Sequence, residues 1–162
     1  MKGFFSKKEP KDLFAKLQKD FDRLKKNHLD EDAALDFFIT AESLTDWAIP
    51  GRKNKEKQML HRNSSILLQI VSHVASGAKH FNVEAKHHKS VSETGKAVGG
   101  LASFRARTFR ASLFMPIFQN NEKLTIYLEG EAKDQLGESI EVNVLATKVL
   151  EYWNNVFGIS KS

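Results

Sequence analysis

The chain contains no cysteine, and this absence excludes disulfide bonds, thiolate metal sites and a cysteine nucleophile. It also has no long uninterrupted apolar run, because the longest one, residues 66–78, is broken by Gln69 and His73. The first ten residues offer only Phe4 and Phe5 where a signal peptide needs a longer apolar core. We therefore expect no membrane-spanning segment and a cytoplasmic protein.

The composition is that of a folded protein with an uneven charge. Of the 162 residues, 41% are hydrophobic, which is ordinary for a globular chain, and the length suits one domain over residues 1–162. Residues 1–119 contain 21 lysines and arginines against 13 acidic residues, whereas residues 120–162 contain 4 against 7. This asymmetry suits a polyanionic partner such as nucleic acid, and it also suits a basic surface that only keeps the protein soluble.

Hydrophobic periodicity predicts three helices in the N-terminal part of the chain, over about residues 10–81. Asp30 is a candidate N-cap of the second helix, and Pro50 with Gly51 ends it. The charged stretch after Gly51 is either a connector or the exposed start of the third helix. The expected helices span residues 10–27, 30–49 and 66–78, and the last of them ends near residues 79–81.

The later part of the chain changes its period. Residues 82–100 are polar and aperiodic, which predicts a long flexible loop. Beyond them, alternating apolar and polar residues predict antiparallel strands, and a polar stretch bounded by glycines predicts a hairpin loop. The expected strands lie at residues 101–114, 123–130 and 138–145, with the hairpin loop at 130–137 and a closing helix at 147–158.

These elements together predict an α+β domain. It has three N-terminal helices, a small antiparallel β-meander or hairpin, and a C-terminal helix. The helical part covers about residues 10–81, and the strands with the closing helix cover about residues 101–158.

Two histidines fall on one face of the third helix, since His73 and His80 are seven residues apart. Seven residues rise about 10.5 Å along a helix, too far for both rings to reach one metal ion at about 2.1 Å. We therefore expect no metal site and no cofactor.

Gly77 lies between these histidines, and a glycine inside a helix costs roughly 1 kcal/mol relative to alanine unless something packs closely against it. Trp47, at the end of the second helix, is the candidate neighbour. We expect structural roles for Trp47, His73, Gly77 and Phe81.

Asp46 lies near the C-terminus of the second helix, where an acidic residue opposes the helix macrodipole. It therefore needs a positive partner, and His80, Lys79 and His73 are the candidates. An Asp–His pair can hold an imidazole in one tautomer for general base catalysis, and the same pair can simply satisfy a half-buried histidine.

The segments "LTDW" and "ASGAKHF" together resemble a family of uncharacterised bacterial and prophage-type proteins. Its signature is a TDW-like tripeptide that ends one helix and an A-N-G-x-K-H-F-like segment that ends the next, and this chain has Ser76 where the pattern usually shows Asn. The resemblance implies no activity. It marks Asp46, Trp47, Ala75, Gly77, Lys79, His80 and Phe81.

The segment "FRARTFR" places basic and aromatic side chains on one face of an expected strand, a combination that meets phosphates and stacks bases. It is also how charge protects an edge strand. If it binds a polyanion, we expect one surface made of Arg105, Arg107 and Arg110 with Arg52, Lys53 and Lys55.

These observations favour a non-catalytic cytoplasmic module that binds nucleic acid or a protein partner. The alternative is a hydrolase or nuclease that uses His80 with Asp46 and Lys79.

Overall fold

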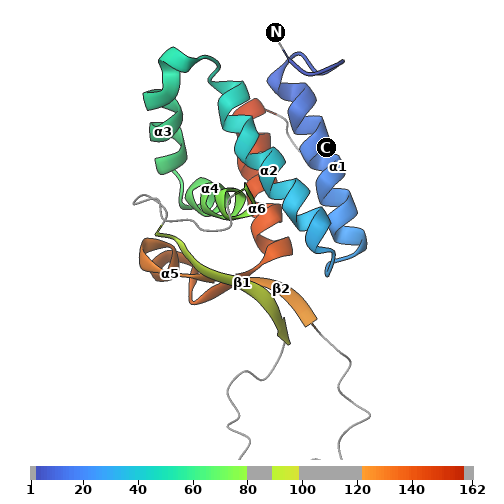
Figure 1. Cartoon of the computed structure of the whole chain (residues 1–162), viewed down its shortest axis with the longest axis vertical. Coiled ribbons are helices and arrows are strands. Elements are labelled where there is room, and N and C mark those ends of the chain that lie inside the picture. The colour runs from blue at the N-terminus through green and yellow to red at the C-terminus, as the bar shows by residue number, and fades with distance from the viewer. Residues whose placement is uncertain (1–2, 80–88, 99–121, 159–162) are drawn as a thin grey trace, which may run out of the picture.

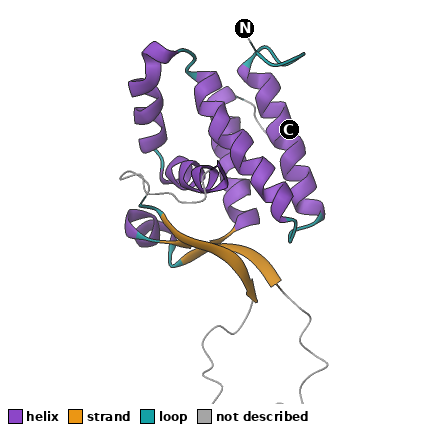
Figure 2. Ribbon diagram, in the orientation of Figure 1, coloured by secondary structure: helices purple, strands orange, loops and turns teal. Residues whose placement is uncertain are grey.

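The computed structural model describes residues 3–79, 89–98 and 122–158. Most of the helices lie on one side of a small sheet (Figures 1 and 2). The elements in chain order are α1 (Pro10–Lys26), α2 (Glu31–Ala48), the short 3-10 helix η1 (Arg52–Asn54), α3 (Lys55–Asn63), α4 (Ile66–Lys79), β1 (Val91–Val98), β2 (Glu122–Leu128), α5 (Gly130–Leu136), β3 (Ser139–Glu141) and α6 (Val142–Phe157).

The first two helices form an antiparallel hairpin. The side chain of Asp30 accepts a hydrogen bond from the backbone N–H of Ala33 at 2.9 Å, so it caps α2 as its position predicts. Lys16 in the middle of α1 contacts Thr40, and Arg23 further along α1 contacts the earlier residue Asp36 of α2. The start of α1 therefore lies beside the end of α2.

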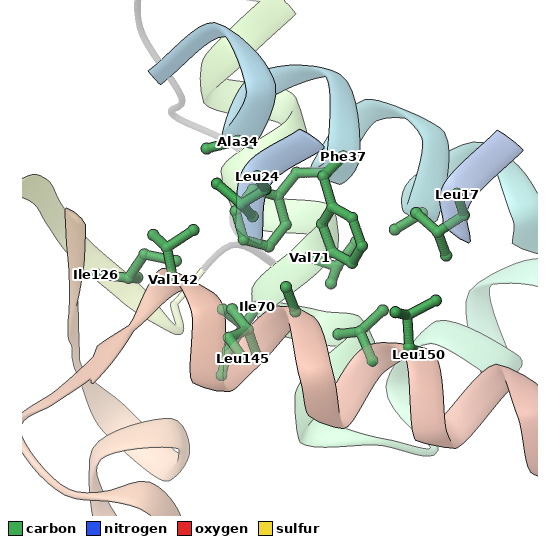
Figure 3. Close-up of a cluster of buried hydrophobic side chains, with 14 of the residues drawn as sticks. Leu17, Leu24, Ala34, Phe37, Ile70, Val71, Ile126, Val142, Leu145 and Leu150 are labelled. Carbon is green, nitrogen blue, oxygen red and sulfur yellow. The ribbon is translucent and has the colours of Figure 1, made fainter. Parts of the chain in front are cut away.

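The core lies between this hairpin, α4, α6 and the sheet (Figure 3). Phe37 of α2, Val71 of α4 and Leu145 of α6 are completely buried there. Trp153 of α6 is also completely buried, and its ring stacks on Phe157 with centroids 5.6 Å apart. Buried residues of α1, α2, α4, α5, α6, β2 and β3 belong to one hydrophobic cluster.

The sheet is antiparallel with the strand order β1-β2-β3. Leu124, Ile126 and Leu128 of β2 alternate along the strand and are buried, so this face of the sheet meets the helices. The residues opposite Ile126 and Leu124 on β1 are Thr94 and Lys96. The helix-facing side of β1 is thus polar, and Lys96 pairs with Glu31 of α2 at 2.9 Å.

The α+β class, the N-terminal helices, the small antiparallel sheet and the C-terminal helix are confirmed. The number of N-terminal helices is wrong, because the charged stretch after Gly51 forms η1 and a separate helix, α3. Gly51 makes the sharp turn from α2 with a φ of 102°, a backbone conformation that favours glycine. No described helix has the length and apolarity needed to cross a bilayer.

Three expectations for the later part of the chain are also corrected. The long loop expected at residues 82–100 contains strand β1. The hairpin loop expected at 130–137 is helix α5, which buries Ala132. The strand expected at 138–145 shortens to β3, because α6 already begins at Val142 and not at residue 147. The strand expected at 101–114 lies outside the described residues.

A polar triad of two buried side chains and one partly exposed lysine joins α1 to α2. Asp20 is 7% exposed and Thr40 is 4% exposed. The Thr40 hydroxyl donates to Asp20 Oδ2 at 2.7 Å, and the Lys16 ammonium lies 2.6 Å from the same oxygen. Asp20 and Thr40 thereby satisfy each other where water reaches poorly, and Lys16 pairs with them from the partly exposed edge.

We predict that Thr40→Val lowers the free energy of unfolding by about 1–3 kcal/mol, because Asp20 loses a buried hydrogen-bond donor. Urea unfolding followed by tryptophan fluorescence measures the change. The matched control is Thr147→Val on the exposed side of α6, which should change stability by less than about 0.5 kcal/mol. Equal effects of the two substitutions would contradict a role for the triad.

Candidate functional site

One end of the molecule collects positive charge. The antiparallel hairpin brings the start of α1 beside the end of α2, and η1 with the start of α3 follows there. The contact between the rings of Phe14 and Phe157, with centroids 5.3 Å apart, brings the end of α6 to the same place. Figure 1 shows these segments together at the top of the view. We call this the basic end, and its cations are Lys7, Lys8, Lys11, Arg52, Lys53, Lys55 and Lys57.

The four cations at the start of α3 and in η1 are exposed. Among the described residues, no acidic side chain forms an ion pair with any of them. Their position opposes the helix macrodipole, whose positive end lies at the N-terminus of a helix. The dipole and the side chains therefore add to one positive potential in solvent.

The start of α1 also carries lysines. Lys7 and Lys8 precede the helix and Lys11 lies in its first turn. The carboxylate of Asp12 accepts hydrogen bonds from the backbone N–H groups of Lys8 and Glu9, at 2.8 and 3.0 Å. These two bonds lower the pKa of Asp12, which stays ionised and caps the helix.

Helix α3 is attached to the protein by side chains rather than by a buried face, since none of its residues is buried. Gln58 donates to the backbone carbonyl of Ile49 at 2.7 Å. The ring of His61 lies against Trp153, with centroids 5.8 Å apart. These contacts lie on one side of α3, so its opposite side, with Met59 54% and Leu60 59% exposed, faces solvent.

Arg62 provides two further attachments. Its guanidinium donates to Glu42 at 2.6 Å and to Asp46 at 2.8 Å. The side chains of Arg62 and Glu42 are only 19% and 14% exposed, so this part of the network is largely shielded from solvent. The hydroxyl of Ser72 on α4 lies 3.4 Å from the same Glu42 carboxylate.

Arg62 is also a positive partner of Asp46, and it was not among the candidates that the sequence offered. The physical reason is α3 itself, which carries Arg62 back to the C-terminal turn of α2. The Lys79 side chain and His80 lie outside the described residues. A group of Asp46, Lys79 and His80 therefore stays a prediction.

His73 joins α4 to the first strand. Its Nδ1 accepts hydrogen bonds from the backbone N–H groups of Ser90 at 3.3 Å and Val91 at 3.1 Å. An accepting Nδ1 carries no proton, so a neutral ring has its proton on Nε2. His73 thereby satisfies backbone donors at the start of β1, and it is 9% exposed.

Gly77 lies near the end of α4. It borders a groove of about 860 Å³, where the described lining comes from the first half of α2, the end of α4 and the sheet. Ala34 and Phe38 line the same groove, whereas Trp47 is not among its described lining residues. The expected packing of Trp47 on Gly77 stays a prediction.

The remaining expected residues divide in two groups. Arg52, Lys53 and Lys55 are exposed at the basic end. The other members of the expected basic surface, Arg105, Arg107 and Arg110, lie outside the described residues, as does Phe81. Within the described ranges, no group of three histidine or acidic side chains is placed to hold a metal ion.

Sequence reasoning missed the contribution of α3 and of the residues before α1. It left residues 51–58 as either a connector or the exposed start of the next helix, although Gln58, His61 and Arg62 have the spacing of one face of a separate helix. These three residues are polar, so a search for hydrophobic periodicity does not find the helix face that they form.

We predict a pH-dependent stability from the packing of His61. Burial of the ring, and to a smaller extent the charge of Arg62, lowers the pKa of His61 below its ordinary value of 6.5. The unfolded chain therefore binds this proton more readily than the folded protein. Its contribution to stability is complete above about pH 6.5 and is lost as the pH falls from there toward the folded pKa.

Urea unfolding at about pH 7.5 and about pH 5.5 tests this prediction. The loss of stability from the higher to the lower pH should be smaller in His61→Gln than in the wild type. It should be unchanged in His28→Gln, which alters an exposed histidine. The same loss in all three proteins would contradict the assignment to His61.

The chain matches no protein-family model, no curated protein and no solved structure in comparisons with known proteins. The resemblance on "LTDW" and "ASGAKHF" therefore stays a prediction. What the chain does has to be inferred from its own residues, and the basic end is the strongest feature they provide.

Proposed function

We propose that this chain is a non-catalytic, cytoplasmic nucleic-acid-binding module whose basic end contacts phosphates. The observation that carries the proposal is the set of cations around the N-termini of α1 and α3, of which all but Lys7 are exposed. Those of η1 and α3 have no acidic partner among the described residues. The cytoplasmic location rests on the absence of cysteine.

The position of these cations supports the proposal more than their number does. Lysine and arginine stabilise a helix at its C-terminus and destabilise it at its N-terminus, by about 0.3–1 kcal/mol each. An anion at the same place is favoured by the helix dipole and by the side chains together. A polyanion with regularly spaced phosphates can contact the starts of both helices at once.

The arrangement of α3 supports the same role. Its polar contacts through Gln58, His61 and Arg62 hold one side against the protein, and the other side remains open to a partner. Arg52, Lys53 and Lys55 project from its start. Binding through phosphates requires no base readout, so we expect affinity with little sequence preference.

We predict that reversing two of these charges, in Lys53→Glu with Lys55→Glu, weakens binding to every nucleic acid tested. Each phosphate that the variant no longer neutralises should reduce the slope of log affinity against log salt by roughly 0.7 for single strands and 0.9 for duplexes. Fluorescence anisotropy with labelled 20-residue oligonucleotides over a salt series measures both quantities.

The matched control is Lys26→Glu with Lys148→Glu. It changes the net charge by the same amount at two exposed lysines outside the basic end. It should retain the wild-type slope. If the wild type binds neither single strands nor duplexes at about 50 mM salt, the proposal is wrong and a protein becomes the expected partner.

A further inference from the structure

The residues before α1 form a turn that presents two phenylalanines next to a lysine-lined pocket. We infer that this turn, with the adjoining face of α1, binds one nucleotide unit of a single strand: the pocket receives its phosphate and a Phe ring stacks on its base. The inference rests on the proposed function, because it names the nucleic acid that the basic end takes.

The turn is closed by two backbone hydrogen bonds. The N–H of Phe4 donates to the Lys7 carbonyl at 2.8 Å, and the N–H of Lys7 donates to the Phe4 carbonyl at 2.9 Å. Phe5 has a φ of 49°, the one positive value of a non-glycine residue in the described chain. A bulky side chain disfavours this conformation, and such strain persists where the surroundings impose it, commonly at functional sites.

Gly3 shows how tightly the turn is packed. A Cβ atom at this position would lie 2.2 Å from the carbonyl oxygen of Lys7, so no other residue fits without opening the turn. Downstream, the bonds of Asp12 to the N–H groups of Lys8 and Glu9 fasten the turn to α1. Close packing at Gly3 therefore holds the beginning of the turn, and the bonds to Asp12 hold its end.

The turn exposes aromatic surface. Phe4 is 59% exposed and Phe5 is 83% exposed, the largest value among the exposed large hydrophobic residues of the described chain. Their rings meet edge to face, with centroids 4.6 Å apart and an interplanar angle of 79°. An exposed pair of rings in a fixed orientation is a stacking platform, because every nucleic-acid base has a π face.

A small pocket of about 220 Å³ adjoins the platform, between the turn and α1. Asp12 and Lys16 line it, but their charged groups are already engaged, Asp12 by backbone N–H groups and Lys16 by Asp20 and Thr40. Lys7, Lys19 and the Ser6 hydroxyl complete the polar lining, and the structure shows no ion pair or side-chain hydrogen bond for any of the three within the described residues. Two ammonium groups and a hydroxyl suit a phosphate.

The order of residues along the chain connects the two features. Phe5, Ser6 and Lys7 are consecutive, so the Phe5 ring and two residues of the pocket belong to the same short turn. In a duplex the base faces are covered by their neighbours and cannot reach Phe5. A single strand offers both a phosphate and a base with an open face, so single-stranded nucleic acid is the class of ligand that fits this site.

The test compares a labelled oligothymidine strand of 20 nucleotides with a 20-base-pair duplex in fluorescence anisotropy titrations. Phe4→Ala with Phe5→Ala should weaken single-strand binding roughly 5- to 150-fold, the range for loss of one stacked base, and should change duplex binding less than about twofold. Its salt slope should equal that of the wild type, since no charge is removed. Val144→Ala, which trims an exposed apolar residue of α6, is the control and should change neither affinity.

Two further variants separate the parts of the site. Lys7→Gln with Lys19→Gln should reduce the single-strand salt slope by roughly 0.7 for each phosphate that is no longer neutralised. Gly3→Val keeps every ring and charge and opens the turn, so it should lose single-strand preference while thermal unfolding shows that the helical core is intact.

The outcomes distinguish this inference from the proposed function. If the wild type binds strand and duplex, and the double Phe variant matches it on both, the inference is overturned and the basic end remains. An equal loss on strand and duplex also overturns it. If the wild type binds neither nucleic acid but binds phosphatidylglycerol vesicles through Phe4 and Phe5, both proposals fail and the turn is a membrane anchor.

Discussion

The packing of α1 against α2 is the contact on which the rest of the arrangement depends. Leu17 and Leu24 of α1 are completely buried, and so is Phe37 of α2. Apolar side chains alone tolerate sliding between helices, whereas the polar triad of Asp20, Thr40 and Lys16 is satisfied in one register only. That register decides which end of the molecule carries the N-terminal turn, η1 and the start of α3.

Helix α3 depends on the same frame in a different way. Arg62 lies between Glu42 and Asp46, and a largely shielded ion pair contributes less to stability than to position, because desolvation offsets much of the Coulomb attraction. His61 adds a ring contact with Trp153. The helix is therefore fixed in orientation without a buried apolar face, and this leaves its basic start and its outer side free for contact with a partner.

The parts of the fold that could be predicted from the sequence are those that bury an apolar stripe. The stripes of α1 and α4 have the helical period, and α6 ends at Phe157, where Gly158 predicts it. Strand β1 could not be found in this way, because Thr94 and Lys96 occupy its helix-facing positions and leave no apolar alternation. The partner of Asp46 was hidden for a related reason: a charge pattern says that a cation is needed, but only the path of α3 says that it is Arg62.

The candidate site was still less visible, because it combines residues whose local signals conflict with stability. Cations at the start of α1 and α3 oppose the helix dipoles, and Phe5 adopts a conformation that its side chain disfavours. Both conflicts occur at one end, where the antiparallel hairpin brings them together.

In the proposed role the cations and the aromatic rings act at different ranges. The field of the basic end attracts a polyanion over about one Debye length, roughly 8 Å at physiological salt, and the rings select a single strand only on contact. Because the first effect is screened by salt and the second is not, the preference for single strands over duplexes should grow as salt rises, even while both affinities fall.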